Sequence, residues 1–232
     1  MKTSIHQPSY FPWLGLLDKI NKSDNFIILD NVQLADRAYQ HRNIFLNNEG
    51  KEHLLTLNIN KKGYRDKYIK DITLSDNSWQ NKHNKFLLHN YKKHFYFDDI
   101  YPQIQHLFEN NYTYLIDVLT DSMKILFDIY QIDTDINFAS QIYTNNNIYK
   151  EDFIIHLLEE SSADTYLSGS GAKSYQKEET FRNKNITLEY QNFKHPQYTQ
   201  NKQEHFTYGL SGLDVAFNLG NEKTHNILKA TR

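Results

Sequence analysis

The stretch HQPSYFPW at residues 6–13 gathers side chains that can bind or transform a small ligand. His6 is of the residue type that best serves as a general base near neutral pH. Tyr10 and Trp13 have flat apolar faces with a polar tip, which suit sugars and nucleotides, and Gln7 adds an amide. A histidine at a strand end is more often structural, so the role of His6 depends on its neighbours.

Polar residues near the next two apolar segments are the candidate neighbours of His6. Asp30 and Gln33 belong to DNVQ, and Arg42 and Asn43 precede the apolar run IFL. An Asp at the end of a strand often caps the following turn, whereas an Arg followed by Asn can also clamp a phosphate or carboxylate. We predict that these residues join His6 in a polar pocket, with a purely structural network as the alternative.

A glycine-rich turn, YLSGSGAKSY at residues 166–175, is the second candidate region. Its glycines follow a predicted strand and precede a predicted helix, an arrangement in which backbone N–H groups can hold a phosphate. The turn lacks the third glycine of a dinucleotide fingerprint and the full pattern of a P-loop, and a tight turn would need the same glycines. The residues that we predict to bind a ligand here are Ser168, Gly169, Gly171 and Tyr175.

The hexapeptide HPQYTQ at residues 195–200 is similar to HQPSY, because both place a histidine and a proline beside an aromatic residue and an amide. His195 is therefore a second candidate for proton transfer, and Tyr198 and Gln200 are candidates for binding. Turn chemistry alone can also produce such a similarity. We predict that the two loops form paired walls of one cleft.

Two buried strands are expected to carry the first two loops. Residues 3–7 are extended in character, residues 25–30 form a continuous apolar run, and the apolar residues between them have helical spacing. A strand, a helix and a strand of this length predict a parallel pair. Ligands bind outside the carboxyl ends of such strands, so we expect HQPSY and DNVQ to face each other there.

The rest of the chain adds a hairpin, helices and two more strands. The segment RNIFLNNEGKEHLLTLNI has two alternating runs joined by NNEG, which indicates a hairpin. Helical periodicity covers residues 78–94, 100–131 and 150–162, while TYLSG and ITLEYQ are typical of short strands. We predict a single α/β domain over residues 1–232, with a Rossmann-like, mostly parallel sheet and a helical insertion at about 78–160.

The composition excludes several kinds of site and partner. The 232 residues include no cysteine, which excludes disulfides, thiolate metal sites and a cysteine nucleophile and fits a cytoplasmic location. A net charge of −2 with interspersed signs gives no general reason to expect nucleic acid as a partner. Neither a membrane-length apolar run, nor a secretion signal, nor zinc-site spacing is present, so we expect no membrane span, no export and no metal.

Several motifs occur in order along nearly the whole chain, from His6 to Gly220. They are IHQPSYFPWLGLLDKINKSDNFIILDNVQ, RN at 42–43, WQNKH at 79–83, YLSGSGAKSY, HPQYTQ and LSGLDVAFNLG. In these motifs the chain resembles the WbqC-like family of bacterial proteins. His83, the last residue of WQNKH, is also a candidate for substrate binding, with packing beside Trp79 as the alternative.

Resemblance to this family implies a role in the synthesis of O-antigen and other surface polysaccharides. Gene clusters of this kind make nucleotide-linked amino sugars with acylated amines, so the implied activity is acyl or aminoacyl transfer to such an amine. His6 or His195 would deprotonate the sugar ammonium, and Gln7, Arg42 or the backbone at Gly169 would stabilise the oxyanion. The implied donor is a thioester of coenzyme A or of an acyl carrier protein, attacked directly because the chain has no thiol.

Two other interpretations stay open. The opening strand, aromatic-proline loop, helix and strand also resemble the nucleotidylyltransferase and pantothenate-synthetase superfamily, which implies ATP-dependent nucleotidylyl transfer or ligation. PWLG stands where that superfamily has HxGH, which puts the usual ATP phosphate chemistry in doubt. The other interpretation is a non-catalytic module that binds a sugar nucleotide or a carrier protein.

Overall fold

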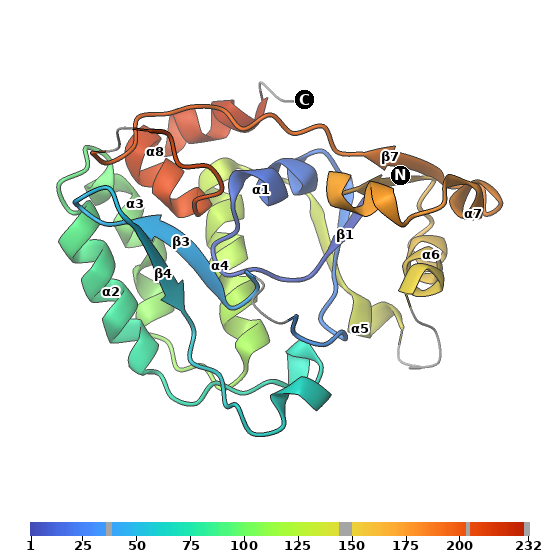
Figure 1. The fold of residues 1–232 in the computed structure, drawn as a ribbon, viewed down its shortest axis with the longest axis horizontal. Helices are drawn as coiled ribbons and strands as arrows, with labels where there is room; N and C mark the ends of the chain where they lie inside the picture. Colours follow the sequence, from blue (N-terminus) through green and yellow to red (C-terminus); the bar gives the residue numbers. More distant parts are fainter. Residues whose placement is uncertain (36–38, 144–149, 203–204, 230–232) are drawn as a thin grey trace.

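Five parallel strands form the central sheet of the molecule (Figure 1). The computed structural model describes residues 1–35, 39–143, 150–202 and 205–229. Across the sheet the strand order is β5-β2-β1-β6-β7, and every neighbouring pair is parallel. The strands are β1 (Lys2–His6), β2 (Asn25–Ile28), β5 (Asp135–Phe138), β6 (Thr165–Ser168) and β7 (Thr187–Tyr190). The predicted α/β fold with a parallel sheet is confirmed.

The described residues also form an antiparallel hairpin and a set of helices. The hairpin pairs β3 (Arg42–Leu46) with β4 (Glu52–Thr56), as the two alternating runs predict. The α-helices are α1 (Leu14–Asn21), α2 (Ser78–Tyr91), α3 (Phe97–Ile104), α4 (Leu115–Tyr130), α5 (Ala139–Ile142), α6 (Lys150–Glu160), α7 (Glu178–Arg182) and α8 (Gly212–Lys229). The 3₁₀ helices are η1 (Tyr64–Asp66), η2 (Ile69–Asp71), η3 (Gln105–Phe108) and η4 (Ser170–Ser174).

The predicted helical insertion at about 78–160 is not helical throughout, because β5 lies within it. Helices α2, α3 and α4 occupy its first part, as their periodicity predicts, but Asp135–Phe138 pairs with β2 at the edge of the sheet. This strand has only four residues, and none of their side chains is fully buried. A segment this short and this exposed carries too little hydrophobic pattern to be recognised as a strand.

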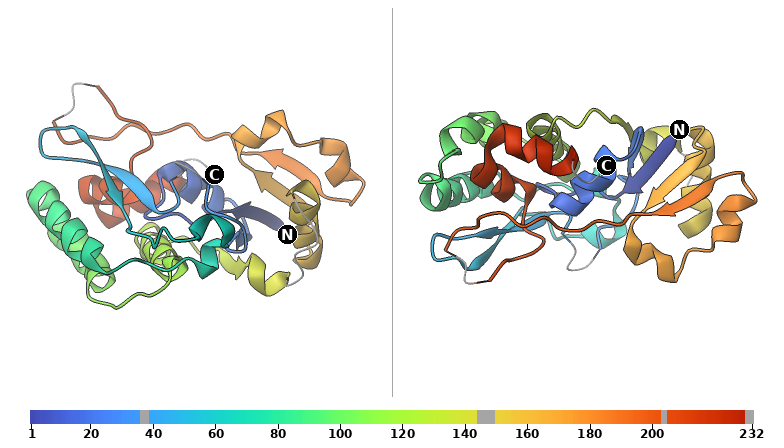
Figure 2. Two further views of the ribbon diagram at one scale, coloured as in Figure 1. Left: turned by 60° about the horizontal axis from the view of Figure 1, so that its bottom comes forward. Right: turned by 90° about the horizontal axis from the view of Figure 1, so that it is seen from above.

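The strands pack against two separate hydrophobic clusters on opposite faces. Phe26 and Ile28 of β2 belong to the larger cluster, which includes residues of α1, α4 and α8. Ile27 lies between them in the strand and belongs to the smaller cluster, which includes residues of α6. This alternation is the two-residue period of a strand buried on both faces. Helices α2 and α3 and the hairpin lie together at the end of the molecule opposite β7 and α7 (Figure 2).

The order of the strands reverses at β1. From β1 the chain builds the sheet outward through β2 and β5, then returns to the other side of β1 and continues through β6 to β7. The connections that follow β1 and β6 therefore diverge, which opens a crevice at the carboxyl ends of these two strands. Ligands of open α/β sheets bind in such a crevice, and the residues that end the two strands are His6 and Ser168.

Candidate functional site

A cavity of about 840 Å³ lies at the carboxyl ends of β1 and β6, and we call it the β1–β6 cavity. Its volume falls within the roughly 300–1,000 Å³ of small-molecule sites, and it combines apolar walls with a few polar groups, as such sites do. Its lining residues are Ile5, His6, Gln7, Lys19, Leu29, Val32, Lys150, Glu151, Phe153, Ile154, Tyr166, Ser168, Gly169, Gly171, Ala172, Tyr175 and Gln176.

His6 ends β1 and lines this cavity. Its Nδ1 lies 2.8 Å from the backbone oxygen of Gln7, so we assign the ring proton to Nδ1, which donates to that oxygen. Nε2 then keeps its lone pair. The side chain is exposed to the cavity, yet desolvation by the surrounding protein and the positive charge of Lys19 lower the pKa of His6. The imidazole is therefore neutral at pH 7, and Nε2 can accept a proton from a ligand.

Lys19 of α1 is a functional candidate that we did not predict from the sequence. Only 4% of its surface is exposed, and its Nζ donates a hydrogen bond of 3.1 Å to the backbone oxygen of Ile5. Burial lowers the pKa of Lys19 to about 7. The available signal is its spacing, since Lys19 lies three residues after Leu16 and so on the apolar face of the helix, where an unpaired lysine is rare.

The glycine-rich turn after β6 lines another side of the cavity. Ser168 is buried, and its Oγ donates a hydrogen bond of 2.8 Å to Oε1 of Gln176. A Cβ atom added to Gly169 or Gly171 would meet no atom within 4 Å, and neither residue has a left-handed φ. The fold therefore does not require glycine at either position, and the missing side chains leave the backbone open to a ligand. Tyr175 is 72% exposed at the edge of the cavity.

The loops that follow β1 and β2 meet beside the cavity. Nε2 of Gln7 donates a hydrogen bond of 3.4 Å to the backbone oxygen of Gln33. Oε1 of Gln7 in turn accepts a short hydrogen bond from Nε2 of Gln40. This contact confirms that HQPSY and DNVQ face each other at the carboxyl edge of the sheet, although Gln33 contributes its backbone and not its side chain.

The sequence matches a known family over nearly its whole length. A sequence model of the WbqC-like protein family matches residues 7–226. The chain belongs to the WbqC-like family. One relative is an uncharacterized protein of Mycobacterium tuberculosis (strain ATCC 25618 / H37Rv), Rv1507c, which is 26% identical over 224 residues that cover 95% of each chain. No solved structure matches the chain.

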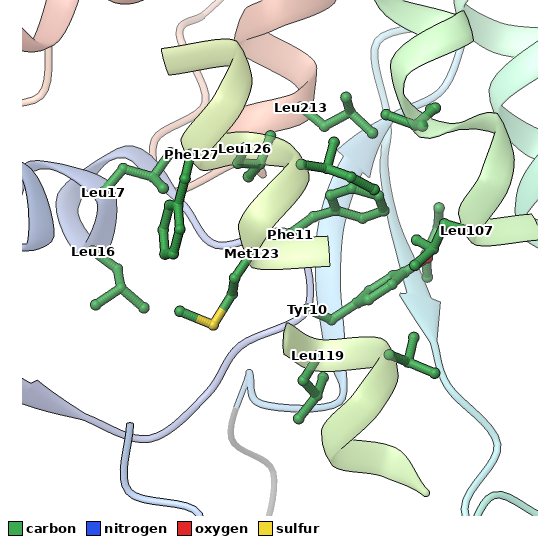
Figure 3. Packing of buried hydrophobic residues seen from close by; sticks show 14 of the residues in the cluster. Tyr10, Phe11, Leu16, Leu17, Leu107, Leu119, Met123, Leu126, Phe127 and Leu213 are labelled. Carbon is green, nitrogen blue, oxygen red and sulfur yellow. The ribbon is translucent and has the colours of Figure 1, made fainter. Parts of the chain in front are cut away.

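Part of the opening motif of this WbqC-like protein lies in the core and not in the cavity. Tyr10 and Phe11 are fully buried and pack beside Met123 and Leu126 of α4 (Figure 3). Phe11 has a left-handed φ of 42°, and its carbonyl oxygen accepts a hydrogen bond of 2.6 Å from Nδ2 of Asn43. Asn43 therefore holds the loop in place, and a binding role for Tyr10 or Asn43 stays a prediction.

His83 of α2 is the hydrogen-bond partner of Tyr10. Its Nδ1 lies 3.0 Å from the hydroxyl of Tyr10, and both side chains are fully buried. Trp79 packs its ring edge-on against both of them. Burial lowers the pKa of His83 to about 3, so the ring is neutral. This arrangement matches the packing alternative for His83, which lies outside the β1–β6 cavity.

The HPQYTQ loop meets the opening motif at Trp13, away from the β1–β6 cavity. The ring of His195 stacks against Trp13 with centroids 6.4 Å apart, and its Nδ1 lies 2.8 Å from the backbone oxygen of Pro196. A separate open hollow of about 500 Å³ lies beside Tyr198 and Gln200. Among the described residues, those that line the β1–β6 cavity include none of this loop.

Tyr198 and Gln200 are engaged in hydrogen bonds within the chain. The hydroxyl of Tyr198 donates a hydrogen bond of 2.6 Å to one carboxylate oxygen of Asp214. The other carboxylate oxygen accepts a hydrogen bond of 2.6 Å from the hydroxyl of Tyr91. Gln200 both donates to and accepts from the backbone of Thr207. Burial raises the pKa of Asp214 to about 6. This buried acid, which we did not predict, ties the loop to α2 and α8.

Asp30 and Arg42 also lie outside the cavity lining. The carboxylate of Asp30 accepts hydrogen bonds of 2.9 and 2.5 Å from the backbone N and the Oγ of Ser140 in α5, so it contacts the first turn of a distant helix and not the turn that follows its own strand. The guanidinium of Arg42 lies 5.7 Å from the centre of the Tyr39 ring. A role for either residue in ligand binding stays a prediction.

Glu151 and Gln176 are further cavity residues that we did not predict. Glu151 lies in the first turn of α6, and its Oε2 accepts a hydrogen bond of 3.3 Å from the backbone N of Lys177. Both residues reach the cavity through the packing of α6 against the turn after β6, which no local motif reveals.

Within the described ranges there is no group of three His, Asp or Glu side chains that could hold a metal ion. No helix in those ranges combines the length and apolar character of a membrane span.

Proposed function

We propose that the chain is a cytoplasmic enzyme of bacterial surface-polysaccharide (O-antigen) synthesis that transfers an acyl or aminoacyl group to the amine of a nucleotide-linked amino sugar. The observation that supports this activity is a neutral His6 that lines a cavity of about 840 Å³ where the strand order reverses. A general base must come within hydrogen-bond reach of its proton donor, and the cavity gives a ligand that access. Membership of the WbqC-like family supports the biological setting.

The reaction requires the removal of a proton from the sugar ammonium before the amine can attack. Nε2 of His6 accepts this proton, and the free amine attacks the carbonyl carbon of a thioester. The new C–N bond forms, the C–S bond breaks, and the departing thiolate takes the proton from the His6 imidazolium. The amide loses its second proton to solvent. No covalent enzyme intermediate is needed, in keeping with the absence of cysteine.

Donors for the oxyanion of this reaction are also at the cavity. The amide of Gln7 and the open backbone at Gly169 both line it. Arg42, the other donor that the sequence suggests, does not line it. The acyl donor in this proposal is a thioester of coenzyme A or of an acyl carrier protein, and the acceptor is the nucleotide-linked sugar.

ATP-dependent nucleotidylyl transfer or ligation is a second candidate. The observation that favours it is Lys19, a buried cation in the same cavity as His6, because an ammonium group suits the phosphates of ATP. The two candidates differ in their products. Acyl transfer consumes a thioester and no ATP, whereas nucleotidylyl transfer releases pyrophosphate.

Incubation of the purified chain with nucleotide-linked amino sugars and acyl or aminoacyl thioesters tests the proposal by mass spectrometry. We expect the sugar nucleotide to gain the mass of the acyl group without ATP. His6→Ala should lower turnover roughly 100-fold or more, as loss of a general base does. His195→Ala is the matched control outside the cavity and should keep turnover within a few-fold of wild type.

The other outcomes assign the protein to a different class. Release of pyrophosphate from ATP in the presence of a sugar substrate would support the second candidate. Loss of turnover in His195→Ala with full activity in His6→Ala would move the reaction to the HPQYTQ loop. Binding of the sugar nucleotide with neither a mass gain nor use of ATP would identify a non-catalytic binding module.

A further inference from the structure

Lys19 and Lys22 lie close together on α1 but differ in their partners. Lys22, whose side chain is 20% exposed, forms an ion pair of 3.0 Å with Asp18. Lys19 is only 4% exposed, and its hydrogen bond goes to the backbone oxygen of Ile5. No carboxylate of the described residues pairs with it. Burial of an uncompensated cation costs free energy, so the countercharge of Lys19 is expected to come from outside these residues.

The other titratable groups that line the cavity do not pair with Lys19. They are His6 on β1, Tyr166 on β6, Tyr175 after η4, and Lys150 and Glu151 on α6. Glu151 is the carboxylate among them, and its Oε2 accepts a hydrogen bond from the backbone of Lys177. Desolvation lowers the pKa of Lys19 to about 7, with no carboxylate to offset it. On its own helix, Asp18 is paired with Lys22.

We propose that the ligand supplies the countercharge, and that the diphosphate of a nucleotide-linked sugar docks on Nζ of Lys19 in the β1–β6 cavity. This inference rests on the proposed function, which provides a ligand with a diphosphate. The ammonium of Lys19 has three N–H donors, and one of them bonds to the backbone oxygen of Ile5. The phosphate oxygens accept hydrogen bonds from the other two. The open backbone at Gly169 and Gly171 leaves room for the same anion to approach the cavity wall.

Docking of the diphosphate links the protonation of Lys19 to that of His6. An anion beside Nζ favours the ammonium form, so binding takes up a proton near and above pH 7. The same anion offsets the positive charge that lowers the pKa of His6 in the free protein. A general base works best when its pKa is near the working pH, so the substrate makes His6 a more effective base as it binds.

Isothermal titration calorimetry of the full chain tests this inference without an acyl donor. The probes are UDP, dTDP and GDP, each compared with its nucleoside at pH 7. We expect at least one diphosphate to bind about tenfold or more tightly than its nucleoside, because charge-assisted hydrogen bonds form. Lys19→Met should remove this difference while nucleoside binding persists. Lys92→Met, an exposed lysine after α2, is the matched control and should keep the difference.

Proton uptake is a second readout, and it needs no variant. At pH 8 the binding enthalpies measured in Tris and in Hepes should differ, because the two buffers have different ionisation enthalpies. The difference should correspond to the uptake of up to about one proton per diphosphate. The proposal is overturned if no diphosphate binds more tightly than its nucleoside, or if Lys19→Met, shown to be folded by circular dichroism, keeps the full preference. If that variant does not fold, absence of proton uptake by the wild type overturns it. Because no acyl donor is present, these outcomes are independent of whether acyl transfer occurs.

Discussion

Buried ionisable groups lie both among helices α2 and α8 and beside the β1–β6 cavity, but their hydrogen-bond partners differ between the two regions. Among the helices, the two oxygens of Asp214 each accept a hydrogen bond of 2.6 Å, from Tyr91 and Tyr198. At the cavity, Lys19 bonds to a single backbone oxygen, and His6 has one bonded ring nitrogen and one open to a ligand. A polar group that is satisfied inside the chain stabilises the fold, whereas one left beside a void is available to bind a ligand.

The same distinction divides the opening motif. His6 and Gln7 line the cavity, whereas Tyr10 and Phe11, only a few residues later, are fully buried. Asn43 anchors the loop between these two environments through the carbonyl oxygens of Tyr10 and Phe11. The part of the motif that packs into the core thus positions the part that faces the cavity, and the two parts are expected to respond differently to mutation.

Removal of Asp214 should have the largest effect on stability. Asp214→Ala leaves the hydroxyls of Tyr91 and Tyr198 buried without their shared acceptor, so we expect the free energy of unfolding to fall by about 3–5 kcal/mol. Urea denaturation measures this loss. Asp128→Ala removes an exposed acid of α4 and should change stability by less than about 0.5 kcal/mol. A loss below about 1 kcal/mol in Asp214→Ala would show that this network is not structural.

His6→Ala should show the opposite pattern. Because the side chain is exposed to the cavity, we expect the free energy of unfolding to change by less than about 1 kcal/mol. Turnover in the acyl-transfer assay should nevertheless fall roughly 100-fold. Denaturation and turnover are to be measured on the same preparation. A loss of stability as large as that of Asp214→Ala would remove the distinction between the two regions.

The edge of the sheet at which the β1–β6 cavity lies could be predicted from local patterns. The strand, helix and strand over residues 3–30 have long apolar runs and clear periodicity, and they fix the carboxyl edge at which His6 and Gln7 lie. Gly169 and Gly171 were predicted from a glycine-rich turn after a strand, and this turn follows β6, which pairs with β1. The position of that strand beside β1, and not at the far edge of the sheet, depends on long-range pairing that one sequence does not reveal.

Residues inside helices and cores were harder to assign. Lys19 lies in a helix whose periodicity indicates the apolar positions, and that pattern does not show that the lysine is buried as well. Tyr10 and His83 have side chains that suit a pocket and a core equally well. A contact between residues 73 positions apart in the chain buries both side chains, and a binding role for either stays a prediction. His195 has the residue type and the turn of a site residue, yet its loop reaches Trp13 and not the cavity.

The pH dependence of stability tests the core side of the comparison. Burial lowers the pKa of His83 to about 3, while an unfolded chain keeps its ordinary value of 6.5. The unfolded state therefore binds a proton that the folded state does not, so the stability due to His83 is complete above pH 6.5 and is lost as the pH falls toward 3. The expected slope is about 1.4 kcal/mol per pH unit.

Two variants of α2 isolate this slope in urea denaturation between pH 6.5 and 4.5. His83→Gln should lower it by about 1.4 kcal/mol per pH unit, whereas His89→Gln, at an exposed position on the same helix, should leave it unchanged. The raised pKa of Asp214 acts in the opposite direction, because its stabilisation is lost as the pH rises toward 6. The difference between the two variants cancels that contribution. Equal slopes in both variants would mean that His83 is not buried in its neutral form.

The smallest effect on the fold is expected from Gly171→Ala. A methyl group there would meet no atom within 4 Å, so stability should change by less than about 0.5 kcal/mol, while diphosphate binding should weaken several-fold because the methyl group occupies space at the cavity. Gly220→Ala is the matched control in α8, where φ is 72° and a Cβ would collide with the ring of Tyr96. It should lose about 1–3 kcal/mol of stability and leave diphosphate binding unchanged. Unchanged binding in Gly171→Ala would mean that the ligand does not approach this turn, and that Lys19 and His6 hold it from the β1 side alone.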